Sequence, residues 1–236
     1  MKINFKDLIV YEGDHYIVIN KPPFVASLAD RNAPVNIQQL AKAYDENLSV
    51  CHRLDKDTSG CLLIAKNADA YRHASIQFEK RTIKKVYHAV SNGLHEFRAH
   101  QVDAPILALP NGTAKVDRRE GKAAQTVFTT QETYRNHSLI ECMPVTGRMH
   151  QIRVHLAMEK APLVHDELYR GASLFLSQIK RNFKLKKDTD ERPLIKRFAL
   201  HAMSLRFDNM VEPILVEAPY PKDFAVLVKQ LRKYKF

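Results

Sequence analysis

Short apolar runs separated by turn residues recur along this chain, and they constrain its fold more than any other feature. The first two, at residues 8–11 and 16–20, flank Glu12-Gly13-Asp14 and predict a β-hairpin. Further strands are predicted at residues 49–55, 61–65, 86–90, 124–130, 138–143 and 197–207. Because strands outnumber helices and come in hairpin-like order, we expect an α+β fold with a mostly antiparallel mixed β-sheet and flanking helices.

Four helices are predicted among these strands. One short helix covers residues 35–44, and Asn67 can cap a second that runs to residue 80. The third begins at Thr146 or Gly147 and ends near residue 159. The fourth, at residues 221–234, is amphipathic, and its apolar face consists of Phe224, Leu227, Val228 and Leu231. No linker rich in Pro, Gly or Ser divides the chain, so we expect a single domain spanning residues 1–236.

The chain is strongly basic, which bears on the partners that it can bind. It has 37 Lys and Arg residues against 26 Asp and Glu, a net charge of +11. Such a surplus suits nucleic acid, but it also fits a solvated surface with no partner. Residues 180–196 are polar and predict an exposed loop. Residues 181–197 are a candidate for phosphate contact, with a merely solvated loop as the alternative.

Cysteine content and hydropathy indicate the compartment. The three cysteines, Cys51, Cys61 and Cys142, form no C-x-x-C pair, which argues against a disulfide scaffold or a zinc ribbon. Residues 1–8 mix charged and apolar side chains, unlike a signal peptide. No apolar run approaches the roughly 20 residues that span a membrane. We therefore expect a cytoplasmic protein with reduced thiols and no membrane partner.

Several enzyme classes lack their usual motifs here. The sequence has no G-x-S-x-G, G-x-x-x-x-G-K-[ST] or G-x-G-x-x-G pattern, which disfavours the common hydrolase, NTPase and dinucleotide-binding families. His150 and His155 are five positions apart, whereas H-E-x-x-H places its histidines four apart. No other His or Cys cluster has ligand spacing, so we expect no metal site.

The stretch from His52 to Gly60, HRLDKDTSG, is the most informative in the chain. On a predicted strand, Arg53 and Asp55 share one face because side chains alternate. Asp55 would then emerge at the strand end, before a polar turn, where a carboxylate suits catalysis. The alternative is that Asp55 and Asp57 simply form the turn.

A second stretch, TGRMHQIRVH from Thr146 to His155, is expected to be helical. Arg153 lies beside the apolar stripe of Met149, Ile152 and Leu156, and an Arg drawn toward a core needs an anionic partner. The opposite face, with Arg148, Gln151 and His155, is expected to be wetter. An ordinary amphipathic helix with exposed Arg and His is the alternative.

These two stretches resemble the signatures of the RluA family of pseudouridine synthases. Three weaker matches follow in the family's order: Asn20-Lys21-Pro22, Lys85-Val86-Tyr87 and Leu200-His201-Ala202. The resemblance spans residues 8–224 and implies the catalytic fold of these synthases, with a central cleft. No additional N-terminal RNA-binding domain is expected. The chain departs from the family at His165 and Arg170, where glycine is usual, and at Met149, where Thr or Ser is common.

The resemblance implies an isomerase that flips a uridine out of ribosomal or transfer RNA and needs no cofactor. Asp55 would act as nucleophile or base, and Arg153 would pair with it. Tyr87 would stack on the uracil and accept a proton, unless it only packs in the core. Arg53 would enter the space left by the flipped base. The remaining candidate substrate-binding residues are His52, Thr58, Arg148, His150 and Gln151.

Two other functions remain open from the sequence. The first is a non-catalytic RNA-binding or ribosome-assembly protein, which would have no need of the Asp55 carboxylate. The second is a metal-free hydrolase using Asp55 with His52 or His150, although no Ser or Cys nucleophile has a recognisable setting. We expect a monomer with no obligate protein partner.

Overall fold

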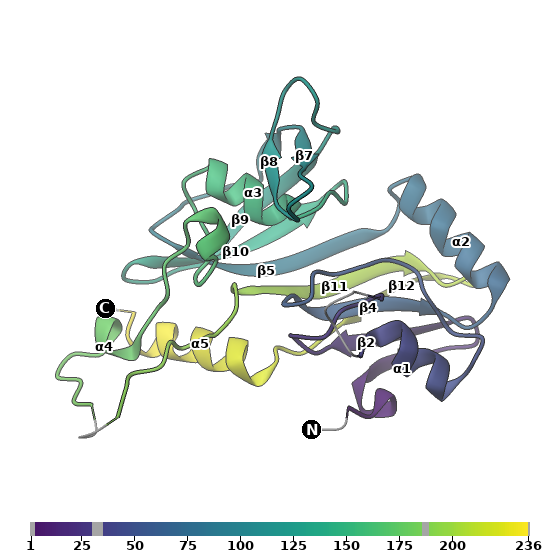
Figure 1. Ribbon diagram of the computed structural model, residues 1–236, viewed down its shortest axis with the longest axis horizontal. Helices are drawn as coiled ribbons and strands as arrows, with labels where there is room; N and C mark the ends of the chain where they lie inside the picture. Colours follow the sequence, from purple (N-terminus) through teal and green to yellow (C-terminus); the bar gives the residue numbers. More distant parts are fainter. Residues whose placement is uncertain (1–2, 30–34, 186–188, 236) are drawn as a thin grey trace. The chain divides into compact units, whose positions relative to one another are not determined.

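The computed structural model describes residues 3–29, 35–185 and 189–235. These residues form two compact units. The first comprises Met1–Val86 and His201–Pro221, and the second comprises Tyr87–Leu200 and Lys222–Phe236. Each unit contains part of the β-structure and its own helices (Figure 1). The expectation of a single domain stays a prediction.

The first unit is built around a short antiparallel sheet with one parallel contact. Its strands are β1 (Ile9–Glu12), β2 (Tyr16–Lys21), β4 (Ser59–Ala65) and β11 (Leu200–Asp208), in the order β1-β2-β4-β11. Two further strands pair at its margins, β3 (Ser49–Val50) with β4 and β12 (Pro213–Glu217) with β11. The pairing of β4 with β11 is parallel, with His201 opposite Ser59. The predicted hairpin at residues 8–20 is confirmed as β1 and β2.

Helices cover this sheet because their apolar stripes match its inward-facing residues. All seven residues of β4 are buried, so both of its faces are covered. Helix α2 (Ala68–Glu79) packs Ala70 and Ala74 against the face that carries Cys61 and Leu63. Asn67 caps α2, as predicted, by accepting a hydrogen bond from the Ala70 amide. The remaining helices of the unit are η1 (Phe5–Leu8) and α1 (Ile37–Tyr44).

The second unit has its own antiparallel strands, in the order β5-β10-β9-β6. They are β5 (Lys84–Asn92), β10 (His137–Pro144), β9 (Gln125–Thr133) and β6 (His100–Asp103), and a separate ribbon joins β7 (Ile106–Ala108) to β8 (Ala114–Val116). Its helices are α3 (Gln151–Met158), η2 (Glu167–Tyr169), α4 (Leu176–Ile179) and α5 (Lys222–Lys233). Figure 1 shows α3 and α5 on opposite sides of these strands.

The predicted fold class is confirmed, because the structure is α+β with mostly antiparallel pairing. The amphipathic C-terminal helix is confirmed as α5, and all four residues of its predicted apolar face are buried. Residues 180–185 and 189–196 contain no helix or strand, as expected for the basic segment, and residues 186–188 lie outside the described residues. Among the described residues, no helix has the length and apolar character needed to cross a membrane.

Two secondary-structure expectations were wrong. The strand predicted at residues 49–55 ends at Val50, and the chain continues as a loop whose backbone groups bond partly to side chains. The helix predicted to begin at Thr146 or Gly147 begins at Gln151, because His150 has a left-handed backbone with φ 54° that interrupts a helix. The sequence patterns also missed the short strands β6, β7, β8 and β12, which carry too few residues for a clear alternation.

Candidate functional site

Asp55 lies in a loop between β3 and β4 rather than at the end of a strand. Its carbonyl oxygen accepts a hydrogen bond from the Thr58 amide at 3.1 Å, which closes a tight turn. The preceding residue, Leu54, is clamped on both sides by Ser27. The Ser27 hydroxyl accepts from the Leu54 amide at 3.0 Å and donates to its carbonyl at 2.9 Å. Side-chain hydrogen bonds therefore replace strand pairing in fixing this loop.

Lys21, from one of the weaker motifs, supports the same loop. Its side chain is fully buried. The ammonium group donates to the carbonyl oxygens of Pro22, Val25 and Lys56 at 2.9, 2.8 and 3.0 Å. Burial of an ammonium is costly unless its protons are all engaged. Lys21 therefore holds the backbone beside Asp55 in place, a role that the sequence did not reveal.

His52 is also a support rather than an exposed contact. Its Nε2 accepts a hydrogen bond from the Leu63 amide of β4 at 3.1 Å, and its ring lies 4.9 Å from that of Phe78. Burial, together with the nearby charge of Lys85, lowers the pKa of His52 to about 3. His52 is therefore neutral at physiological pH. Its neighbour Arg53 is exposed, whereas Thr58 is buried.

The loop leads into a contact between two motifs that are far apart in the sequence. The Ser59 hydroxyl bonds Nδ1 of the buried His201 at 2.9 Å, and Nε2 of His201 bonds the Ala218 carbonyl at 3.0 Å. Because that carbonyl can only accept, Nε2 carries the proton and Ser59 donates to Nδ1. Gly60 has φ 112°, and a Cβ there would lie 2.1 Å from the Ala202 carbonyl oxygen. Only glycine permits this close approach.

Arg153, in the second unit, forms a buried ion pair. Its Nε and Nη2 donate to the two carboxylate oxygens of Asp166, both at 2.7 Å. The guanidinium also lies 4.0 Å from the ring centre of Phe198 and 4.9 Å from that of Tyr169. The expectation that this Arg needs an anionic partner is confirmed in Asp166, to which the sequence assigned no role. The pairing of Arg153 with Asp55 stays a prediction.

The face of α3 that was expected to be wet is buried. Gln151 uses its whole amide: Oε1 accepts from the Thr146 hydroxyl and the Arg148 amide, and Nε2 donates to Gln125 and Thr126. His155 is fully buried between Thr126 and the Ala104 carbonyl, with ring nitrogens 2.9 Å from each. This network explains why the helix starts only at Gln151. The side-chain amide of Gln151 closes the turn at residues 146–150 by accepting hydrogen bonds from Thr146 and Arg148.

Arg148 and His150 are more accessible. The Arg148 Nε donates to the Ala123 carbonyl at 3.0 Å. His150 Nδ1 lies 2.8 Å from the hydroxyl of Tyr169, and that hydroxyl accepts from the Ala114 amide at 3.0 Å. Tyr169 therefore orients His150, as Asp166 orients Arg153.

The segment that supplies both of these orienting residues contains two of the three departures from the family pattern, His165 and Arg170. His165 has φ 62° and Arg170 has φ 68°, a left-handed conformation that glycine adopts without strain. His165 Nδ1 lies 2.7 Å from the Ser173 hydroxyl. His165 and Arg170 therefore adopt the left-handed backbone conformation that glycine favours, although both carry large side chains.

Tyr87 is a half-buried residue of β5, opposite Cys142 of β10, and packs against the core beneath α3. Asp55 belongs to the first unit, whereas Tyr87 and Arg153 belong to the second. Their action in one catalytic centre stays a prediction.

Within the described residues, no group of three or more His, Cys, Asp or Glu side chains is arranged to hold a metal ion.

Comparisons with known proteins agree with these motifs. The sequence model of the RNA pseudouridylate synthase family matches residues 15–158. The ribosomal large subunit pseudouridine synthase D of Xanthomonas campestris is 36% identical over 95% of this chain and 69% of its own length. Synthase C of Vibrio vulnificus is 31% identical over 96% of this chain and 70% of its own.

The solved structure of human RNA pseudouridylate synthase domain containing 4 has a TM-score of 0.72 and 25% identity, covering 97% of this chain and 95% of that protein. The family match covers more than half of the chain, and the similarity to the bacterial synthases extends over nearly all of it. This chain therefore belongs to the RNA pseudouridylate synthase family, whose members are isomerases that convert uridine to pseudouridine in RNA.

Proposed function

We propose that this chain modifies uridine in large-subunit ribosomal RNA and that Asp55 is its catalytic carboxylate. The observation that carries the assignment is the support of the Asp55 loop. Lys21, Ser27 and His52 each bond its backbone or the strand beside it. Such convergent support is expected of a loop whose side chain must be held in a productive geometry. The names of the bacterial relatives support ribosomal RNA as the substrate.

The proposed reaction is an isomerisation in which every atom is retained. The N1–C1′ bond of uridine breaks, the base turns, and a C5–C1′ bond forms. C5 then loses its proton and N1 gains one, so neither an oxidant nor an energy source is consumed. A stacked uridine is out of reach and must first be flipped from the RNA.

In this proposal Asp55 attacks the ribose or the base as a nucleophile, or abstracts a ribose proton. Arg153 stabilises the ionised carboxylate, and its guanidinium is oriented by Asp166. Tyr87 stacks on the uracil and takes up the C5 proton. Because a free tyrosine has a pKa near 10, this step needs help from a base or water.

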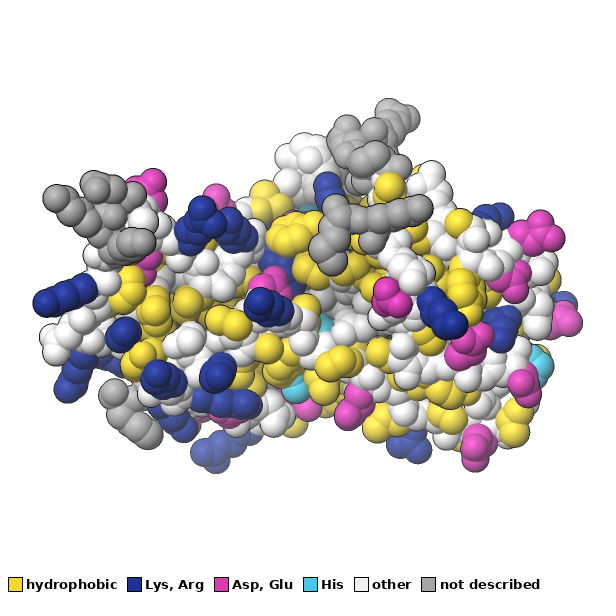
Figure 2. Space-filling view, turned by 90° about the horizontal axis from the view of Figure 1, so that it is seen from below, with side chains coloured by type: hydrophobic (Ala, Val, Ile, Leu, Met, Phe, Trp, Pro, Cys, Tyr) yellow, Lys and Arg dark blue, Asp and Glu magenta, His cyan; other side chains and the backbone are white. Residues whose placement is uncertain are grey.

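Basic side chains of the second unit supply phosphate contacts in this proposal. Lys222, Lys229 and Lys233 are exposed on α5, whereas the exposed Arg232 is engaged in an ion pair with Glu132. Figure 2 shows Lys and Arg side chains gathered around this helix, at the left of the view. Such contacts would make RNA affinity fall steeply with salt concentration.

Purified protein and unmodified transcripts of large-subunit ribosomal RNA and transfer RNA test this function. The parent should form pseudouridine in the ribosomal transcript, and Asp55→Asn should lower the rate by roughly 10⁴-fold or more at unchanged melting temperature. Tyr87→Phe should slow single turnover, and an unchanged rate would remove its hydroxyl from the mechanism. Product in transfer RNA alone would contradict the proposed substrate. Binding without any product would favour a non-catalytic RNA-binding protein.

A further inference from the structure

Phe24 is an exposed aromatic residue in a backbone conformation that favours glycine. Its φ is 67°, and 52% of the residue is exposed. The preceding Pro23 fixes its own φ near −65°. A negative φ followed by a positive one is the pattern of a type II turn, whose third position selects glycine. A bulky residue there is strained, and such strain often marks a binding site.

One buried ammonium fixes this turn relative to the loop that carries Asp55. Lys21 Nζ bonds the carbonyls of Pro22 and Val25, on either side of Pro23 and Phe24. The third hydrogen bond of the same group goes to the Lys56 carbonyl, one residue after Asp55. The ring of Phe24 is therefore presented from a backbone anchored directly to the proposed catalytic loop.

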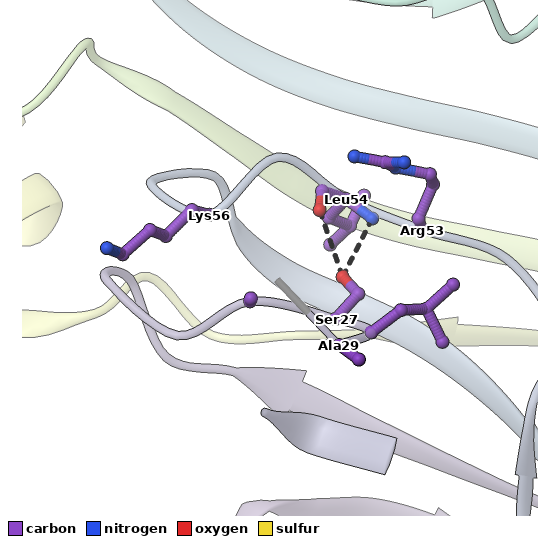
Figure 3. Close-up of a pocket in the computed structure, with 7 residues that line it drawn as sticks. Ser27, Ala29, Arg53, Leu54 and Lys56 are labelled. Carbon is purple, nitrogen blue, oxygen red and sulfur yellow. Dashed lines mark hydrogen bonds between the residues drawn. The ribbon is translucent and has the colours of Figure 1, made fainter. Parts of the chain in front are cut away.

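A pocket of about 270 Å³ lies between the residues that follow this turn and the loop. Ala26 to Ala29 line one side, and Arg53, Leu54 and Lys56 line the other. Figure 3 shows the two hydrogen bonds between Ser27 and Leu54 that join the two sides, with the side chains of Arg53 and Lys56 extending from the loop in different directions. Its size, just below the range of roughly 300–1,000 Å³ for small-molecule sites, suits a single small group. The cationic side chains of Arg53 and Lys56 favour an anionic group in this pocket.

We propose that Phe24 and this pocket bind one nucleotide of the substrate RNA beside the target uridine. Flipping the uridine removes a stacking partner from its neighbour, and an aromatic ring can replace it. Phe24 stacks on the neighbouring base, while Lys56 contacts its phosphate at the pocket. This inference rests on the proposed function, because it takes the Asp55 loop as the place where the uridine is held.

Phe24 variants separate a role in RNA binding from a role in the turn. Loss of the ring in Phe24→Gly and Phe24→Ala should weaken affinity for the unmodified ribosomal transcript by roughly 5- to 150-fold, the range for one stacked base. Phe24→Tyr should keep the parent affinity. The melting temperature should depend instead on the backbone conformation at residue 24. Phe24→Gly should melt about 2–4 °C above Phe24→Ala, because glycine tolerates the positive φ. Tyr71→Ala, which removes another exposed aromatic residue of the first unit, is the matched control and should leave affinity unchanged.

Lys56→Gln tests the phosphate contact. A plot of log affinity against log salt concentration has a negative slope. Loss of this contact should make the slope shallower by about 0.7, the value for one phosphate contact with a single strand. Lys42→Gln, an exposed lysine on α1, should leave it unchanged.

Affinities are measured by filter binding, which does not require turnover. If the parent binds the transcript but forms no pseudouridine, the proposed function fails while the comparison of affinities still decides this inference. Parent-like affinity in Phe24→Gly would overturn it. So would affinities that rank with melting temperature across the Phe24 variants, or a parent that does not bind the transcript.

Discussion

Replacing Gly60 with alanine should destabilise the protein far more than the same replacement at Gly112. Both glycines have a positive φ, 112° and 80°, so both substitutions incur backbone strain of about 1–3 kcal/mol. At Gly112 the new Cβ would have nothing within 4 Å. At Gly60 it would lie 2.1 Å from the oxygen and 2.7 Å from the carbonyl carbon and amide nitrogen of Ala202. Backbone atoms cannot move aside as a flexible side chain can.

The collision at Gly60 must separate β4 from β11 where they pair in parallel. That separation endangers the buried hydrogen bond of Ser59 with His201, whose loss would leave polar groups unsatisfied at a cost of about 1–3 kcal/mol. Adding the strain gives about 2–6 kcal/mol, before any loss of packing. At roughly 2–4 °C per kcal/mol for a chain of this size, Gly60→Ala should melt at least about 4 °C below the parent. Gly112→Ala should lose only the strain component.

Urea unfolding and calorimetry of the two variants and the parent provide the comparison. Failure of Gly60→Ala to fold, with normal folding of Gly112→Ala, would also support the steric collision with Ala202. Equal stability of the two variants would refute it, because the steric contact with Ala202 is what distinguishes them.

Two further predictions concern titration and backbone strain. The pKa of His52 is about 3 in the folded state, below its unfolded value near 6.5. The unfolded chain therefore binds more protons between these values, and stability that is complete above pH 6.5 is lost as pH falls toward 3. Urea unfolding from pH 7.5 to 5 should show this decline, to which His52 contributes at most about 1.4 kcal/mol per pH unit. In His52→Gln, whose amide can still accept from Leu63, the decline should be shallower, and an equal slope would contradict the assignment. Arg170→Gly should raise the free energy of unfolding by about 0.5–1 kcal/mol, because relief of the positive φ exceeds the entropy cost of glycine. Arg72→Gly, an exposed position within α2, should lower it by about 1 kcal/mol, and a loss at both positions would show that Arg170 is not strained.

Local patterns were sufficient where an element buries a regular face. The apolar runs of β2 and β4, the Asn67 cap and the buried stripe of α5 all follow from residues close together in the sequence. The runs match strands that are buried on both faces, and the stripe of α5 follows the 3.6-residue period of a helix. The need of Arg153 for an anionic partner also followed from its place beside an apolar stripe.

The same patterns failed where side chains from distant segments determine the backbone. Residues 51–55 were expected to continue a strand, yet the hydrogen bonds of Ser27 with Leu54 and of Lys21 with Lys56 hold the chain there as a loop. Residues 146–150 have a helical pattern, yet the Gln151 amide closes a turn there. In both places, specific hydrogen bonds to buried polar groups stabilise the irregular backbone more than continuing the strand or helix would stabilise the chain.

The sequence by itself determined the α+β class, the family signatures and the identity of Asp55 as the candidate carboxylate. Only the tertiary structure showed Asp166 as a partner of Arg153, Lys21 as the support of the Asp55 loop, and Phe24 as an exposed residue with a positive φ in a turn that Lys21 ties to that loop. The physical reason is that composition and periodicity report which residues are buried, whereas hydrogen-bond partners and backbone angles depend on residues brought together from separate parts of the chain.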